Sequence, residues 1–337
     1  MIVTIAAFSA ALSITSCSTA RMAYRPYEKE YRPRGYLVKD TYRCSVPGPK
    51  ARYMFVYLPE SYFDSGMEYP VVYLLHGANG NETSWIRKGR ILENIDSLRL
   101  DGKVAECIYV FPDMNHYRND SDFRTPHEKK SIEAFLGLNG SIEYAFMNDV
   151  VKHVDSSYRT IPHKDCRAIG GLSLGGQILL EILSRRKDIC KYAIVESALV
   201  IPSKFTYSMI KPAFGSCYGL IKYKWFSKLQ FKSLRIKSNL FDEYYKDTCA
   251  ISKSDMIAFL QENSVYSLKD GIGECETTVQ IYVGEKENHS MKKSAKIIHE
   301  KLQGSFIQVL PNMYHGEFSI NHADDYVRKL LKIVKQR

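Results

Sequence analysis

The sequence lacks several patterns that would point directly to a function. None of its eight cysteines forms a CxxC pair, and no histidine lies near them at a spacing typical of zinc ligands, so no zinc site is expected. No internal repeat and no nucleic-acid-binding motif is visible. The one apolar run near the start, within residues 1–17, is too short to span a bilayer comfortably. These absences leave an ordinary globular protein as the starting expectation.

The composition fits that expectation. The chain has 337 residues, of which 45% are hydrophobic and 25% charged, which suggests one large domain or two modest ones. A core of this size can be stable without disulfides. Cys107, Cys166 and Cys190 lie in or beside apolar runs and are expected to be buried free thiols, while a disulfide among the other cysteines stays open. The net charge of +10 favours anionic surfaces but says nothing about the fold.

The N-terminus resembles an export signal. Residues 1–17, MIVTIAAFSAALSITSC, have about the length of a secretory apolar region and end in small residues. Its last four residues, 14–17, resemble the lipobox of bacterial lipoproteins, in which the peptide is cut before a cysteine that receives diacylglycerol. This resemblance implies lipidation of Cys17. No Lys or Arg precedes the apolar run, so an ordinary cleaved signal peptide with an incidental Cys17 stays the alternative.

The segment after the signal has the composition of a tether. Residues 18–35 are polar, basic and proline-bearing, without a period. We therefore expect a folded domain over residues 36–337 in a bacterial cell envelope, as a periplasmic or outer-membrane lipoprotein. A lipid anchor at Cys17 would be its only link to a membrane.

Apolar segments of strand length alternate with segments of helical period along most of the chain. This alternation is typical of an α/β protein with a mostly parallel sheet and helices on both faces. The expected strands are 51–59, 69–77, 104–113, 166–171, 192–198, 277–285 and 305–311, and the expected helices are 141–158, 177–186, 290–302 and a last one near 322–335.

One region departs from the alternation. Residues 200–270 are rich in Tyr, Phe and Lys, most densely over 221–237. Aromatic side chains between lysines could stack on nucleic-acid bases or lie on a membrane. The apolar positions form no single clean stripe, however. We therefore predict a cap-like helical insertion packed over the sheet, after the fifth or sixth strand, and no nucleic-acid partner.

The most informative stretch is AIGGLSLGGQ, residues 168–177, which contains a GxSxG pentapeptide centred on Ser173. The pentapeptide alone is a weak signal, but an apolar strand precedes it and a helix follows. In that setting the serine hydroxyl is presented on a strained turn at the top of the sheet. Gly171 and Gly175 are expected to be needed because side chains there would clash with the tight turn and the facing helix.

A serine hydroxyl needs a base, and the base needs an acid that holds it in the right tautomer. His315 lies between the last expected strand and the terminal helix and is the predicted base, while His322 is more typical of a capping or surface residue. Glu287, three residues after the glycine that ends a strand, is the predicted acid, with Glu285 as second choice. The order of Ser173, acid and histidine is that of α/β-hydrolases.

The oxyanion of a tetrahedral intermediate needs backbone N–H donors. The first expected donor is the N–H of Leu174, directly after the nucleophile. The second is the N–H of Ala78, in the sequence LLHGANG, where Gly77 allows close approach. His76 is expected to order this loop through hydrogen bonds without taking part in the chemistry.

Several motifs together resemble one family. Residues 56–85 (VYLPESYFDSGMEYPVVYLLHGANGNETSW), FPD at 111–113, SYRT at 157–160 and GGLSLGG at 170–176 resemble the esterase family of α/β-hydrolases. That family includes esterase D (S-formylglutathione hydrolase), feruloyl and acetyl-xylan esterases, and the mycolyltransferases of the antigen 85 group. The resemblance runs from about residue 50 to 200, and its motifs occur in the order and at the spacing of the family. It implies an α/β-hydrolase fold.

The resemblance carries over Ser173 as nucleophile, His315 as base, and Leu174 and Ala78 as oxyanion donors. The family usually has Asp where this chain has Glu287. The 200–270 insertion is expected to shape the acyl or alcohol pocket, so the substrates of relatives do not predict the substrate of this chain. The expected activity is that of a serine carboxylesterase acting on acylated carbohydrates or small esters, with no metal or cofactor required. An acyltransferase with the same residues and an inactive, binding-only lipoprotein remain alternatives.

Overall fold

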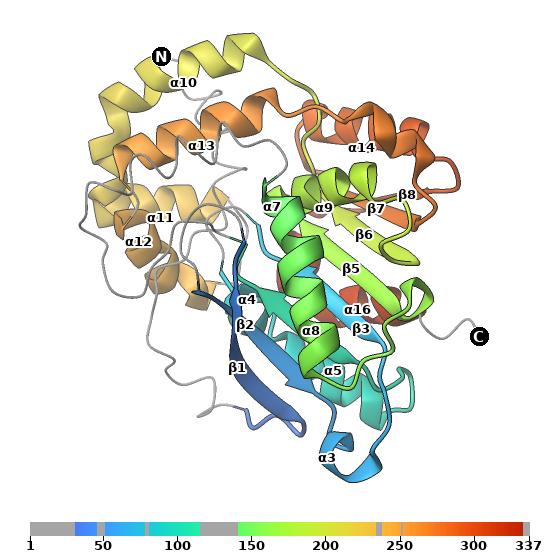
Figure 1. Ribbon diagram of the computed structural model, residues 1–337. Coiled ribbons are helices and arrows are strands. Elements are labelled where there is room, and N and C mark those ends of the chain that lie inside the picture. The colour runs from blue at the N-terminus through green and yellow to red at the C-terminus, as the bar shows by residue number, and fades with distance from the viewer. Residues whose placement is uncertain are drawn as a thin grey trace.

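The computed structural model describes residues 31–45, 51–77, 81–114, 141–233, 238–250 and 252–332. At its centre lies one eight-stranded sheet (Figure 1). Its strands are β1 (Tyr36–Arg43), β2 (Ala51–Leu58), β3 (Val71–Leu75), β4 (Ile108–Pro112), β5 (Arg167–Leu172), β6 (Tyr192–Glu196), β7 (Thr278–Gly284) and β8 (Phe306–Leu310).

The sheet is mostly parallel, as the sequence predicts. The strand order is β1-β2-β4-β3-β5-β6-β7-β8. The β1–β2 and β2–β4 pairs are antiparallel, and every other pair is parallel. Because parallel strands end at the same edge, the residues that follow β3, β5, β6, β7 and β8 meet there. In open α/β sheets this carboxyl edge is where ligands bind.

Helices cover both faces of the sheet (Figure 1). Two separate groups of buried apolar side chains, one on each face, join the sheet to these helices. The first face carries α7 (Ser141–Ala145), α8 (Val151–Ser157), α9 (Leu174–Arg185) and α14 (His289–Lys301), and the second carries α4 (Ser84–Lys88), α5 (Ile91–Leu100), α15 (Glu317–Asn321) and α16 (Ala323–Lys332); a short α3 (Tyr62–Ser65) precedes β3.

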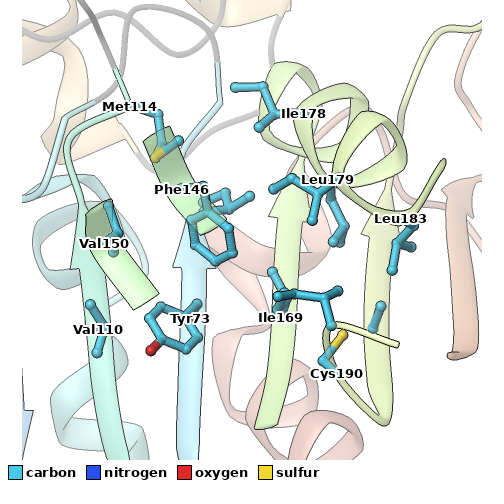
Figure 2. Close-up of a cluster of buried hydrophobic side chains, with 14 of the residues drawn as sticks. Tyr73, Val110, Met114, Phe146, Val150, Ile169, Ile178, Leu179, Leu183 and Cys190 are labelled. Atoms are coloured by element: carbon cyan, nitrogen blue, oxygen red, sulfur yellow. The ribbon is translucent and has the colours of Figure 1, made fainter. Parts of the chain in front are cut away.

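Figure 2 shows the core on the first face. The ring of Phe146 meets that of Tyr73 edge to face, with centroids 5.2 Å apart, and both side chains are fully buried. Ile169 of β5 and Leu179 of α9 belong to the same cluster. Strands β3 and β5 are buried along their whole length, which explains why they appear in the sequence as continuous apolar runs.

The sequence does not predict every element. The sequence indicates no strand at β1, because its residues contain no apolar run and no regular hydrophobic alternation, and most of its side chains are exposed or half-buried. Helices α4 and α5 were also missed. The helix expected over 141–158 is present but contains one π-helical turn, Phe146–Val150, between α7 and α8.

The region between β6 and β7 is helical, as predicted. Its main helices are α10 (Lys204–Cys217), α11 (Lys224–Ser233), α12 (Phe241–Ala250) and α13 (Lys253–Val265). They have small apolar clusters of their own and lie together at the upper left of Figure 1. Within the described ranges, no helix combines the length and the hydropathy that a membrane crossing would need.

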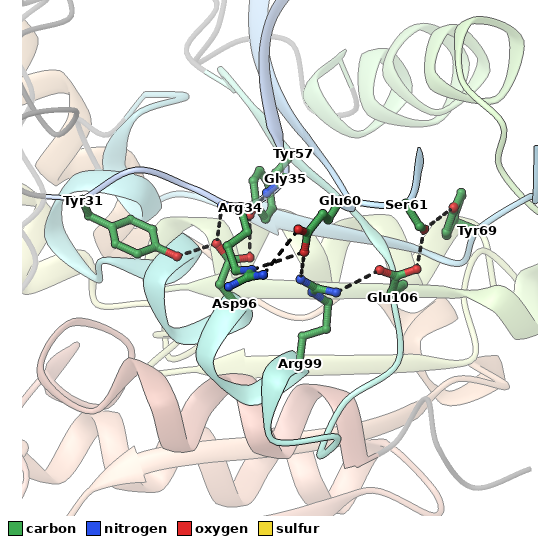
Figure 3. A network of polar contacts seen from close by, with 10 residues as sticks. All are labelled: Tyr31, Arg34, Gly35, Tyr57, Glu60, Ser61, Tyr69, Asp96, Arg99 and Glu106. Atoms are coloured by element: carbon green, nitrogen blue, oxygen red, sulfur yellow. Dashed lines mark hydrogen bonds and ion pairs between the residues drawn. The ribbon is translucent and has the colours of Figure 1, made fainter. Parts of the chain in front are cut away.

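The last residues of the expected tether pack against the folded domain (Figure 3). The hydroxyl of Tyr31 donates to Asp96 of α5, and the backbone N–H of Arg34 donates to the same carboxylate at 2.8 Å. Asp96 is buried and also accepts a hydrogen bond from Tyr57 at 2.5 Å. Residues 31–35 are therefore attached to α5 and β2, whereas residues 1–30, including Cys17, lie outside the described part.

The cysteines agree with the expectation where the structure describes them. Cys107, Cys166 and Cys190 are buried, and the seven cysteines from Cys44 to Cys275 are all free thiols. The same described residues contain no group of three or more His, Cys, Asp or Glu side chains placed to hold a metal ion.

Candidate active site

Ser173 occupies a strained turn between β5 and α9. Its backbone torsions are φ 54° and ψ −112°, a conformation that residues other than glycine rarely adopt and that costs about 1–3 kcal/mol. The N–H of Ser173 donates to the carbonyl of Glu196 at 2.8 Å, which fixes the turn to the end of β6. The side chain is largely buried, since the residue is 7% exposed.

The flanking glycines make this turn possible. A Cβ built on Gly171 would lie 2.4 Å from the carbonyl oxygen of Gly175, at the start of α9. A Cβ built on Gly175 would lie 2.4 Å from the carbonyl oxygen of Leu75 and 2.6 Å from that of His76. Gly171 thus faces the helix that the sequence predicts, but Gly175 faces the end of β3 and not a helix.

The end of β3 approaches Ser173 on the side where oxyanion donors are expected. Leu174 is the first residue of α9, so its N–H has no partner within the helix. Gly77 follows β3, and Ala78 lies outside the described residues. The close approach of Gly175 to β3 places the Gly77 segment beside the N-terminus of α9.

His76 holds the segment after β3 through both ring nitrogens. Its Nε2 accepts the N–H of Met114 at 3.0 Å, so Nε2 carries no proton. Its Nδ1 then donates to the carbonyl of Gly77 at 2.8 Å. The contact of Nε2 with Asp113 at 3.5 Å is consequently not an ion pair. The two hydrogen bonds join Gly77 to Met114 through the ring of His76, as the predicted loop-ordering role requires.

His315 pairs with Glu287. The distance from Nδ1 of His315 to Oε2 of Glu287 is 2.8 Å, and both residues are buried. The other oxygen, Oε1, accepts the N–H of Gly284 at 2.8 Å and the hydroxyl of Ser197 at 2.7 Å. Burial by itself would raise the pKa of Glu287, but the charge of His315 and these hydrogen bonds outweigh it and lower the pKa.

Glu285, the second choice for the acid, contacts the loop after β8 and not His315. Its Oε2 accepts the backbone N–H of Asn312 at 2.8 Å, and this hydrogen bond lowers its pKa. The backbone N–H of Glu285 also donates to Leu310, and that of Lys286 to Met313. Glu285 therefore helps to join the loop after β7 to the loop after β8, and these loops carry Glu287 and His315.

The loop that carries His315 contacts the turn at Ser173. A Cβ built on Gly316 would lie 3.5 Å from Cδ1 of Leu172, so the residue after His315 packs against the residue before Ser173. His322, the rival histidine, lies between the end of α15 and the start of α16. It takes no part in the Glu287 hydrogen bonds.

Glu196, which the sequence analysis did not single out, is a buried residue whose carbonyl accepts the N–H of Ser173. Glu196 ends β6 and is 2% exposed. Its Oε1 accepts the N–H of Ser319 at 3.3 Å, while Oε2 has no hydrogen-bond partner among the described residues. Burial raises the pKa of Glu196 to about 7. The sequence pattern that indicates a buried Glu196 is its place as the acidic last residue of an otherwise apolar strand.

A small pocket opens beside the strand ends. It is lined by residues of β5, of α4 and α15, and of the segments that follow β3 and α4: His76, Gly77, Ser84, Trp85, Lys88, Gly89, Leu172, Ser319 and Ile320. Its lining therefore includes Gly77, which precedes Ala78 in the chain, and Leu172, which precedes Ser173.

Comparison with curated proteins finds relatives over part of the chain. An endo-1,4-beta-xylanase/feruloyl esterase from Xylanibacter ruminicola is 33% identical over 141 residues, which cover 41% of this chain and 18% of that protein. Endo-1,4-beta-xylanase Y from Acetivibrio thermocellus is 26% identical over 187 residues, or 50% of this chain and 15% of that protein. The chain thus spans less than a fifth of these relatives.

Solved structures share the fold at low sequence identity. A ferulic acid esterase from Anaeromyces mucronatus in complex with ferulic acid superposes with a TM-score of 0.59 at 18% identity, covering 94% of this chain and 98% of that one. An esterase from Exiguobacterium antarcticum gives a TM-score of 0.60 at 16% identity, covering 89% and 100%. These likenesses establish the α/β-hydrolase fold.

A family model covers most of the domain. The family described as "Putative esterase" matches residues 49–303, which include Ser173 and Glu287 and end before His315. This match extends past the 50–200 range where the sequence motifs resemble the family. With the fold and the geometry above, it identifies the chain as a member of the esterase family of α/β-hydrolases.

Proposed function

We propose that the protein is a serine carboxylesterase in which Ser173 is the nucleophile, His315 the base and Glu287 the acid. The main support is the buried Glu287–His315 hydrogen bond of 2.8 Å, in a loop whose next residue packs against the strained Ser173 turn. With Nδ1 of His315 bound to the carboxylate, Nε2 is left to accept the proton of Ser173.

The acylation step uses this arrangement directly. The Oγ of Ser173 attacks the ester carbonyl carbon, and its proton moves to Nε2 of His315. The imidazolium is stabilised by Glu287, whose lowered pKa keeps it ionised. The carbonyl π electrons move to the oxygen, which the N–H groups of Leu174 and Ala78 stabilise. When the tetrahedral intermediate collapses, the ester C–O bond breaks and the alcohol leaves with the proton of His315.

Deacylation repeats the sequence with water. His315 takes a proton from water, whose oxygen attacks the acyl carbon, and then returns that proton to Oγ of Ser173 as the acid leaves. We place the acyl group in the pocket that includes Gly77 and Leu172, because these residues flank the proposed oxyanion donor Ala78 and the nucleophile.

We propose esters of carbohydrates or small alcohols as substrates. The support is that the curated relatives are named as xylanases, one of them also as a feruloyl esterase. A location in the bacterial cell envelope, with a lipid on Cys17, agrees with such a substrate and is supported by the sequence of residues 1–17. Metabolic labelling of the full chain with a lipid precursor, compared with Cys17→Ala, tests the anchor.

A fluorophosphonate probe tests the nucleophile. It should label the purified protein, and Ser173→Ala should lose both labelling and turnover of p-nitrophenyl acetate. Labelling or turnover at the wild-type level in Ser173→Ala would remove Ser173 from the mechanism. A panel of acetyl, butyryl and feruloyl esters, with Ser173→Ala as the blank, then defines the substrate class. Product analysis with an added sugar acceptor separates hydrolysis from acyl transfer.

A further inference from the structure

The turn after β6 touches two of the proposed catalytic residues at once. The carbonyl of Glu196 accepts the N–H of Ser173 at 2.8 Å. The next residue, Ser197, donates its hydroxyl to Oε1 of Glu287 at 2.7 Å and its N–H to the carbonyl of Tyr282 at 3.0 Å. Two consecutive residues therefore hold the backbone of the nucleophile and the side chain of the acid.

Ser197 adopts a conformation that is unfavourable for serine. Its φ is 54°, in the left-handed region where a Cβ atom is crowded by the neighbouring backbone. Such strain is kept only where the surrounding structure fixes it, and it gathers at functional sites. The residue is 4% exposed. At this turn the strained backbone places the hydroxyl against the carboxylate of Glu287.

A glutamate needs more restraint than the shorter aspartate, because its side chain has one more rotatable bond. The carboxylate of Glu287 is held on both oxygens: Oε2 contacts Nδ1 of His315, and Oε1 accepts two hydrogen bonds. One of these comes from the backbone N–H of Gly284, which belongs to the same turn as Glu287. The hydroxyl of Ser197 comes from the turn after the neighbouring strand β6, and it fixes the carboxylate relative to the rest of the sheet.

We propose that Ser197 is a positioning residue of this site, whose hydroxyl holds one oxygen of Glu287 so that the other faces His315. The proposal rests on the proposed function of Ser173, Glu287 and His315. Ser197 touches neither the substrate nor the reacting atoms; it acts through Glu287. The loss of its hydroxyl leaves Oε1 with one hydrogen bond and lets the carboxylate turn away from the imidazole.

Two substitutions separate the hydroxyl from the strained backbone. Ser197→Ala removes the hydroxyl and keeps the Cβ strain, whereas Ser197→Gly removes both. We expect kcat for p-nitrophenyl acetate to fall about 10- to 100-fold in both, the range for loss of a hydrogen bond to a charged group, with little change in KM. Ser197→Gly should be the more stable variant of the two. If either variant keeps the wild-type kcat, the proposal is wrong.

The pH profile of kcat/KM distinguishes positioning of Glu287 from a purely structural role of Ser197, because a structural role would leave that profile unchanged. The Ser197 hydrogen bond stabilises the ionised carboxylate of Glu287, so its loss makes that carboxylate more basic. The Glu287–His315 pair then keeps its proton to a higher pH. The acid limb of kcat/KM should therefore shift to higher pH in Ser197→Gly, and an unshifted limb would contradict the proposal.

A double-mutant cycle tests whether Ser197 acts through Glu287. In a Glu287→Gln background, Ser197→Gly should lower kcat little further, because the two residues act as one unit. Full additivity would contradict the proposal. Arg90→Gly is the matched control: it relieves a similar positive φ, 49°, at the residue before α5, so it should retain the wild-type kcat and pH profile.

The outcomes for Ser197 and for the proposed function are distinguishable. If Ser173→Ala keeps full turnover, the proposed function fails, and the role of Ser197 fails with it. If Ser173→Ala is inactive and Ser197→Gly has wild-type kcat, only the positioning role fails.

Discussion

Nδ1 of His315 lies 2.8 Å from Oε2 of Glu287 across 28 residues of sequence. The pair forms because two adjacent parallel strands, β7 and β8, end at the same edge of the sheet. Hydrogen bonds between the two loops, such as that from Asn312 to Glu285, keep the imidazole and the carboxylate together.

Replacing Glu287 by Gln should lower kcat for p-nitrophenyl acetate about 10³- to 10⁴-fold. A neutral amide neither stabilises the imidazolium nor enforces the tautomer with a proton on Nδ1, and losses of that size are known for such changes. The matched control is Glu285→Gln, whose amide oxygen can still accept the N–H of Asn312 and which should keep nearly wild-type kcat. A Glu287→Gln enzyme as active as Glu285→Gln would exclude Glu287 as the acid. Steady-state kinetics on both variants decide this.

Replacing Gly175 by Ala should destabilise the protein by about 1–3 kcal/mol, as overpacked positions do, and should lower kcat. The new Cβ would lie 2.4 Å from the carbonyl oxygen of Leu75, so β3 and α9 must move apart, taking Gly77 and Ser173 with them. Gly215→Ala, in α10, meets nothing within 4 Å and should instead gain about 0.5–1 kcal/mol from helix propensity. Urea denaturation measures both, and equal stabilities would contradict the prediction.

Replacing Glu196 by Gln should stabilise the protein at alkaline pH. Burial raises the pKa of Glu196 from 4.5 to about 7, so between these pH values the folded protein keeps a proton that the unfolded chain has released. The wild-type free energy of unfolding therefore falls as pH rises through this window, by about 3 kcal/mol in total.

Glu196→Gln has no proton to lose, so its stability relative to wild type should rise between pH 5 and pH 8. Urea denaturation at both pH values measures the difference. The control Glu285→Gln, at an exposed position whose pKa is lowered, should show no such gain. A gap between Glu196→Gln and wild type that stays constant with pH would show that Glu196 is ionised throughout.

Replacing Ile320 by Val should shift the preference for acyl chain length. Ile320 lines the pocket next to Leu172, and removal of one methylene enlarges it. We expect the ratio of kcat/KM for butyryl over acetyl esters to rise about tenfold, at the low end of what one methylene contributes. Ile298→Val makes the same chemical change on the buried side of α14 and should leave the ratio unchanged. An unchanged ratio in Ile320→Val would place the acyl group elsewhere.

Much of the site could be predicted from sequence because its parts are local. Ser173 stands in a strand–turn–helix segment, and Gly171 and Gly175 lie two residues before and two residues after it. The apolar runs of β3 and β5 predicted buried parallel strands for the same reason. Strand β1 was missed because its residues do not repeat a hydrophobic pattern, and only pairing with β2 makes it a strand.

Other parts depended on contacts between distant segments. Glu285 and Glu287 are separated by one residue and have the same chemistry, so the choice between them rested on which carboxylate the turn after β7 directs toward His315. The buried state of Glu196 and the contact of Ser197 with Glu287 likewise arise only when β6 and β7 lie side by side.

The sequence by itself determined the chain's α/β class, the turn at Ser173 and the resemblance to esterases, because backbone conformation and hydrophobic periodicity are encoded by neighbouring residues. Only the tertiary structure decided which carboxylate pairs with His315, which carboxyl group is buried and which hydroxyl donates to Glu287. The physical reason is that hydrogen bonding and desolvation depend on distances in space, and the strand order that sets those distances joins residues far apart in the chain.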